Sequence, residues 1–171
     1  MLNVQLSNAV EIDHFPSGRG LEFHDFTQGD KGRSNIELHI LDSYQNKFSA
    51  SLAHFLPILV SANFPGHAPH LSFGLSGAGE HSLYLENYLP EPVEQVLSQV
   101  VNKRIGRREI VEIGNLAFVN TATIRDDLIA VAHYCCGLGY QYVVCTATRM
   151  LRLVFFKGGY QTNSPGRCES G

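Results

Sequence analysis

The residues best suited to chemistry lie in one short segment, where a carboxylate, a glycine and an amide interrupt an apolar run. Glu112, Gly114 and Asn115 stand among the β-branched and apolar residues of 110–119. Side chains alternate between the two faces of a regular strand, so Glu112 and Asn115 would point to opposite faces. A β-bulge at Gly114 would shift that phase and bring both side chains to one face. The pattern therefore predicts a strand with a bulge, in which Glu112 is the candidate proton acceptor.

The same bulge would expose backbone groups to a ligand. An extra residue in one strand leaves N–H and C=O groups without ladder partners. We expect the backbone of Leu116, Ala117 and Phe118 to offer such groups to the amides of a ligand, with Asn115 bonding the ligand or the acceptor. The alternative is structural, with Glu112 and Asn115 bonding a neighbouring loop as most buried polar groups do.

A basic cluster precedes this strand. Arg104, Arg107 and Arg108 follow Lys103 closely in the sequence. One interpretation is a landing patch for phosphates or for an acidic carrier protein, because guanidinium groups bind phosphate in a bidentate manner. The other is a charged turn that keeps the edge of a sheet soluble.

Histidine and cysteine give weaker signals. His67 and His70 lie in a loop rich in proline and glycine with no third ligand nearby, so we expect a solvated loop and no metal. Cys135 and Cys136 fall within a predicted helix, and no C-x-x-C, G-x-S-x-G or H-E-x-x-H motif occurs. A nucleophilic hydrolase therefore has little support.

The second half of the chain predicts a helix, then a strand–helix–strand unit and a last helix. Pro92 begins a helix with an apolar stripe, and Ile110–Val119 is the strand. Thr123 and Asp126 form a T-x-x-D capping box for the next helix, whose N-terminus at Thr123 would attract an anion. A buried strand at 142–147 and a helix at 148–157 follow. Two strands joined through a helix favour parallel pairing.

The first half predicts a helix and an antiparallel meander. Residues 1–34 show no periodicity and are expected to form a loose leader to a single domain at 35–171. Ile36, Ile40, Tyr44 and Phe48 recur every four residues, as on one stripe of a helix. Short apolar runs at 51–55, 58–62, 71–75 and 82–86 read as strands. The fold class is α/β (α+β), a mixed sheet with flanking helices.

Composition excludes several classes of protein. The 171 residues are 44% hydrophobic and 17% charged, unlike a disordered or coiled-coil chain. A net charge of -3 gives no electrostatic reason for binding nucleic acid or an anionic membrane. The longest apolar run, 52–62, is interrupted by His54 and Pro57 and is too short to span a membrane. The cysteine pattern and the polar N-terminus predict a cytoplasmic protein.

Three ordered blocks carry a family resemblance. Residues 88–95 (YLPEPVEQ), 108–117 (REIVEIGNLA) and 144–151 (VCTATRML) resemble the bacterial thermostable hemolysin family, which is regarded as GNAT-like. The order strand, helix, strand and helix ending in FFKGGY (155–160) resembles the core of the GNAT acyltransferases. The spacing from Glu112 to Ala117 also resembles the strand that carries an acidic residue in acyl-homoserine-lactone synthases.

The resemblance implies transfer of an acyl group from a thioester to a small amine, such as an amino acid or related metabolite. Glu112 would accept the amine proton, and the arginine cluster would steer the donor. GNAT enzymes place a glycine-rich turn before the capped helix to hold the CoA pyrophosphate, but residues 119–124 (VNTATI) have no glycine. Of the two donors, acyl-CoA and acyl-phosphopantetheine on acyl carrier protein, the second therefore suits this turn better. No metal is expected.

Two further functions stay open. The family name taken literally implies a cytolysin that acts on membranes. The residues after Tyr160 do not supply the strands that close a GNAT sheet, so the chain is expected to be a truncated, non-catalytic acyl-binding relative or to complete its sheet edge as a homodimer.

Overall fold

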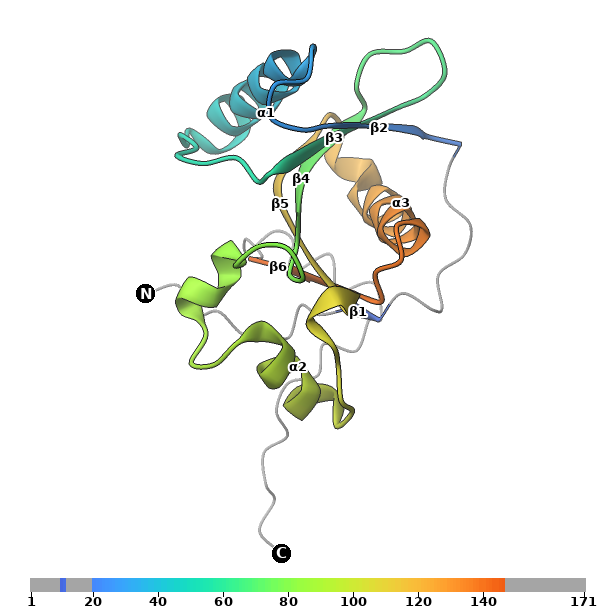
Figure 1. The fold of residues 1–171 in the computed structure, drawn as a ribbon. Coiled ribbons are helices and arrows are strands. Elements are labelled where there is room, and N and C mark those ends of the chain that lie inside the picture. The colour runs from blue at the N-terminus through green and yellow to red at the C-terminus, as the bar shows by residue number, and fades with distance from the viewer. Residues whose placement is uncertain (1–9, 12–19, 147–171) are drawn as a thin grey trace, which may run out of the picture.

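The computed structural model describes residues 10–11 and 20–146, and these form one mixed sheet flanked by helices (Figure 1). The strand order is β1-β6-β5-β4-β3-β2. The strands are β1 (Val10–Glu11), β2 (Glu22–Phe26), β3 (Ile58–Asn63), β4 (Leu71–Gly77), β5 (Ile110–Phe118) and β6 (Tyr142–Cys145). The helices are α1 (Arg33–Phe48), α2 (Val93–Val101) and α3 (Ile124–Gly137), with 3-10 turns η1 (Tyr84–Tyr88), η2 (Arg107–Glu109) and η3 (Thr121–Thr123). The predicted fold class is confirmed.

Strand pairing follows the chain. β2, β3, β4 and β5 pair antiparallel in sequence order, whereas β5 and β6 pair in parallel. The parallel pair is joined through α3, as parallel neighbours require a long crossover connection. This confirms the predicted parallel pairing of the strand carrying Glu112 with the strand at 142–145.

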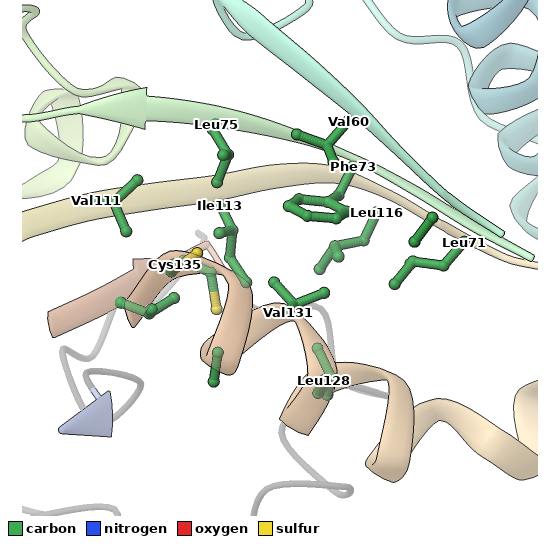
Figure 2. Packing of buried hydrophobic residues seen from close by; sticks show 14 of the residues in the cluster. Val60, Leu71, Phe73, Leu75, Val111, Ile113, Leu116, Leu128, Val131 and Cys135 are labelled. Atoms are coloured by element: carbon green, nitrogen blue, oxygen red, sulfur yellow. The ribbon is translucent and has the colours of Figure 1, made fainter. Parts of the chain in front are cut away.

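The two faces of the sheet bury different helices. α3 packs on one face, where Leu128, Val131 and Cys135 meet apolar side chains from β3 to β6 (Figure 2). On the other face, Ile36 and Ile40 of α1 pack against the sheet. α2 and η1 form a separate apolar cluster on β5 and β6. The second face is therefore covered by two separate groups of helices, α1 and the pair α2 and η1, and β5 contributes residues to both clusters.

Some predicted strands are absent from the observed sheet. Residues 58–62 and 71–75 are strands as expected, but 51–55 is a loop, and 82–86 runs from a loop into the first residues of η1. Conversely, the prediction of a loose leader does not hold for residues 22–26, which form β2. β2 is an edge strand with three exposed residues, and such a strand lacks the strong apolar signal of a buried one.

The predicted capping box at the start of α3 is also wrong. Thr123 makes no side-chain hydrogen bond to the helix backbone. Its hydroxyl instead donates to the carboxylate of Asp127, which is fully buried. Asp126, the predicted capping-box partner of Thr123, is exposed. The predicted final helix at 148–157 and the question of closing strands concern residues outside the described part of the chain.

Candidate functional site

β5 contains the predicted bulge, one residue later than expected. Ser72 pairs with Ala117, while Gly74 pairs with Gly114, so Asn115 and Leu116 together lie opposite Phe73. Asn115 has φ 50, in the left-handed region that asparagine adopts more readily than most residues. The extra residue is therefore accommodated at Asn115 itself.

The bulge shifts the phase of the strand as the sequence predicted. Ile113 and Leu116 both belong to the cluster under α3, although an odd spacing would separate them in a regular strand. Glu112 and Asn115 are consequently brought to the opposite face, where both line one cavity. The hypothesis that a bulge places the two polar side chains together is confirmed.

A pair of glycines makes room for the loop over this bulge. Gly74 and Gly114 lie opposite each other on β4 and β5. A Cβ on Gly74 would approach Asn115 Oδ1 to 2.7 Å and Leu56 Cβ to 2.9 Å, both shorter than real contacts. Leu56 can therefore rest on the strand pair only because these positions lack side chains.

Asn115 fastens that loop. Its Oδ1 accepts from the backbone N–H of Leu56 at 2.9 Å, and its Nδ2 donates to the His54 carbonyl at 3.0 Å. Both ends of the amide thus form hydrogen bonds with the loop. This matches the alternative raised in the sequence analysis, in which Asn115 bonds a neighbouring loop and not a ligand. Its role is to position the cavity wall.

A buried arginine that the sequence analysis missed fastens the end of the same loop. The Arg33 guanidinium donates to the carbonyls of Leu56 at 3.2 Å and Pro57 at 2.8 Å, and to that of Phe26 at 3.0 Å. It also pairs with Glu37 on the next turn of α1. A lone arginine at a helix start has no sequence signal that distinguishes it from a solvated one.

Glu112 is 2% exposed and bridges β5 to η1. Its Oε2 accepts from the backbone N–H of Tyr84 at 2.7 Å, and its Oε1 accepts from that of Leu85 at 2.9 Å. Burial raises the pKa of Glu112 to about 7, with the two N–H groups opposing the rise and the charge of Glu86 adding to it. The carboxyl group therefore changes protonation near neutral pH.

The cavity beside Glu112 has a volume of about 350 Å³, at the lower end of the range for small-molecule sites. It opens between α1, the 51–56 loop and η1. The Thr146 hydroxyl on its wall is buried and has no hydrogen-bond partner among the described residues. The polar and aromatic side chains of the wall include Tyr44, Phe55, Tyr84, Glu112, Asn115 and Thr146.

Residues 116–118, whose backbone was predicted to bind a ligand, follow the part of β5 that pairs with β6. The parallel ladder ends at Ile113 and Cys145. Within the described residues, Ala117 and Phe118 therefore pair with β4 on one side only, and Leu116 lies in the bulge. Their side chains are buried. The Leu116 backbone forms a hydrogen bond with the Tyr44 hydroxyl, which opposes the rise in the pKa of Tyr44 caused by burial.

The structure separates the three arginines of the basic cluster. Arg107 lies 2.6 Å from Glu86 Oε1 and 2.7 Å from Glu94 Oε2, and so ties η1 to α2. The hydrogen bonds from Arg107 lower the pKa of Glu86 to about 2. Arg104 and Arg108 are exposed. Arg107 therefore acts as a structural clamp, and only the other two remain candidates for steering a donor.

The start of α3 does not suit a pyrophosphate. Its first turn carries Asp126 and Asp127, whose charges oppose a bound anion. Asp127 Oδ2 accepts from Thr123, and its Oδ1 lies 2.9 Å from His70 Nε2. The sequence missed this pairing and expected His70 in a solvated loop. The choice between the two donors stays a prediction.

Comparison with known proteins identifies the family. The family model described as thermostable hemolysin matches residues 26–166 of the sequence. The chain belongs to the thermostable hemolysin family. The match begins at the last residue of β2 and covers every later element of the described fold, including the strand with Glu112.

Other comparisons are more distant. A solved structure described as "The structure of L-PGS from Bacillus licheniformis" has 13% sequence identity to this thermostable hemolysin family member and a TM-score of 0.48. The similarity covers 81% of this chain but only 45% of the other, so the chain spans less than half of that protein. No curated protein matches the sequence significantly. No helix in the described part of the chain has the length and apolar character needed to cross a membrane.

Proposed function

We propose that this thermostable hemolysin family domain is a GNAT-like N-acyltransferase that moves an acyl group from a thioester to an amine. The observation that carries the proposal is the position of Glu112, a buried carboxyl group on the wall of a cavity at a strand bulge. Its pKa of about 7 suits a general base at neutral pH. The cavity is the acceptor site.

The reaction needs one proton to leave the amine. The amine nitrogen attacks the thioester carbonyl carbon, the new C–N bond forms, and the C–S bond breaks. The nitrogen of the neutral amine loses a proton to the Glu112 carboxylate, directly or through water. The protonated Glu112 then passes this proton, directly or through water, to the departing sulfur, which leaves as a thiol. The two transfers balance, so no further reactant is required.

The donor would approach along β5. The backbone of Leu116, Ala117 and Phe118, past the end of the β6 ladder, would orient the thioester arm. The acidic first turn of α3 favours acyl-phosphopantetheine on a carrier protein over acyl-CoA. Exposed Arg104 and Arg108 would contact the acidic carrier.

A second function is favoured by one observation. Both carboxylate oxygens of Glu112 accept backbone N–H groups, which is how a purely structural carboxylate is held. On this basis the domain would bind acyl groups without transferring them, and Glu112 would only join η1 to β5.

Replacing Glu112 with glutamine separates the two functions. If Glu112 is the base, thiol release with acyl carrier protein or acyl-CoA donors should fall by roughly a hundredfold or more. Glu22→Gln, the same change at an exposed position of the edge strand β2 that does not line the cavity, serves as the matched control and should keep the wild-type rate. Unfolding curves of both variants give the folded fraction used to normalise the rates. An unchanged rate in Glu112→Gln would remove Glu112 from the mechanism.

A further inference from the structure

The charge on the cavity wall is one-sided. Among the described residues that line the cavity, Glu112 is the only acidic one, His54 is the only one that can carry a positive charge, and there is neither lysine nor arginine. Arg33 fastens the lining loop from behind, but its guanidinium is committed to the carbonyls of that loop and of β2 and to Glu37. A ligand carboxylate in this space would face Glu112, with no lysine or arginine among the described residues to receive it, and like charges brought together disfavour binding.

Aromatic side chains form one part of the remaining wall, beside aliphatic and small residues. Tyr84, at the start of η1, lines the cavity and is 47% exposed, with its ring held edge-on by Tyr88 at a centroid separation of 5.6 Å. The two hydroxyls lie 3.0 Å apart. Tyr44 and Phe55 supply further aromatic surface. Aromatic rings attract both apolar groups and cations.

One residue fixes the relation between the charge and the ring. The backbone N–H of Tyr84 bonds Glu112, while the side chain of Tyr84 lines the same cavity. The carboxylate and the aromatic surface are thus held together by η1, and a ligand can contact both at once.

We propose that the acceptor is a monoamine with an apolar, preferably aromatic, body and no carboxylate. Its nitrogen lies beside Glu112, and its body packs on Tyr84. This inference rests on the proposed function for its reaction and narrows the expected acceptor, since an amino acid carries a carboxylate that the cavity does not accommodate. The selectivity is a property of binding and can be measured without an acyl donor.

Four probes of similar shape test this selectivity with the full chain. Phenethylamine, L-phenylalanine, 3-phenylpropionate and 2-phenylethanol differ in charge but share the phenyl group. Calorimetric or ligand-observed NMR titrations compare their dissociation constants at pH 8, above the pKa of about 7 of Glu112, so that its carboxylate is charged. Phenethylamine should bind about tenfold or more tightly than L-phenylalanine, with 3-phenylpropionate weakest. Equal or tighter binding of L-phenylalanine, or no binding of phenethylamine at millimolar concentration, would overturn the proposal.

Two substitutions at one position test the ring. Tyr84→Phe keeps the aromatic face and the backbone N–H to Glu112, so phenethylamine affinity should stay near wild type. Tyr84→Leu keeps only the N–H and should weaken phenethylamine by about threefold while changing 2-phenylethanol less. Equal affinity of the two variants for phenethylamine would contradict the role of Tyr84.

A third variant adds the missing cation. Ser51 is exposed and lines the cavity. Ser51→Arg should raise the affinity for L-phenylalanine relative to phenethylamine. An unchanged ratio would argue against charge as the basis of selectivity.

Transfer assays distinguish this inference from the proposed function. Acyl transfer to amino acids in preference to monoamines would leave the proposed function standing and overturn the inference. Selective phenethylamine binding without acyl transfer from any donor would overturn the proposed function and leave the amine site standing.

Discussion

Tyr84 N–H donates to Glu112 Oε2 across 2.7 Å, and this bond joins a 3-10 turn to the bulged strand. Leu85 completes the arrangement by donating to the other oxygen. The buried carboxylate is thereby held on the wall of the cavity, and no cation among the described residues pairs with it, which explains why burial dominates its pKa. The same bond links the stability of the fold to the protonation of the candidate base.

The raised pKa of Glu112 predicts a loss of stability as pH rises. An unfolded glutamate ionises near 4.5, whereas in the folded protein Glu112 keeps its proton up to about 7. Between these values the folded state binds more protons, so the free energy of unfolding falls with pH, by about 3 kcal/mol in total. The charge of Glu86 adds to this effect, while buried Cys145, whose pKa is raised to about 12, stays neutral.

Urea unfolding at pH 5, 6, 7 and 8 measures this effect. Glu112→Gln lacks the titrating group, so the wild type should lose stability relative to this variant as pH rises. A constant difference between the two proteins across this range would show that the pKa of Glu112 is not raised.

Replacement of Arg107 should destabilise the fold. Arg107→Ala leaves Glu86 and Glu94 without their partner and breaks the tie between η1 and α2, at a cost of about 2 kcal/mol. Arg104→Ala and Arg108→Ala, which change exposed residues, should stay within about 0.5 kcal/mol of wild type. Thermal unfolding of the three variants gives the comparison, and equal stability of all three would contradict the clamp.

The two exposed arginines should affect a carrier-dependent assay. Arg104→Ala and Arg108→Ala should raise the KM for an acyl carrier protein and make it less sensitive to salt, since exposed charges steer association. The KM for acyl-CoA should change less. Identical effects on both donors would argue against a carrier surface.

Gly74→Ala should displace the loop that covers the bulge. The added methyl group would collide with Asn115 Oδ1 and Leu56, so we expect a destabilisation of about 1–3 kcal/mol. Gly137→Ala is the matched control, because a Cβ there meets no atom within 4 Å. Chemical unfolding should find the control close to wild type, and two equally stable variants would exclude the steric role of Gly74.

Two replacements of Asn115 isolate the backbone strain of the bulge. Asn115→Ala and Asn115→Gly both lose the bonds to Leu56 and His54, but only alanine is strained at φ 50. The glycine variant should therefore be more stable by about 1 kcal/mol. Urea titration of the pair measures this difference. Equal stability of the two variants would contradict a left-handed backbone at residue 115.

Local sequence patterns determined a large part of the fold. The apolar periodicity of Ile36, Ile40 and Tyr44 predicted α1, and the apolar stripe after Pro92 predicted α2. The break in the apolar pattern at Glu112 and Asn115 predicted the bulge and the shared face. These features depend on residues that are close together in the sequence, so the spacing of apolar and polar residues is enough to predict them.

Only the tertiary structure decided what each polar group binds. Glu112 meets the N–H groups of residues 84 and 85, Asn115 meets the loop at 54–56, and Arg107 meets Glu86. Each of these partners lies far along the chain, and a polar side chain has the same sequence signature whether it binds water or a distant backbone group. The sequence by itself therefore predicted that the bulged strand carries a polar site. The packing of η1 and the 51–56 loop determined the wall of the cavity at that site. Hydrogen-bond partners are selected by the folded geometry, so this part could not be predicted from the sequence.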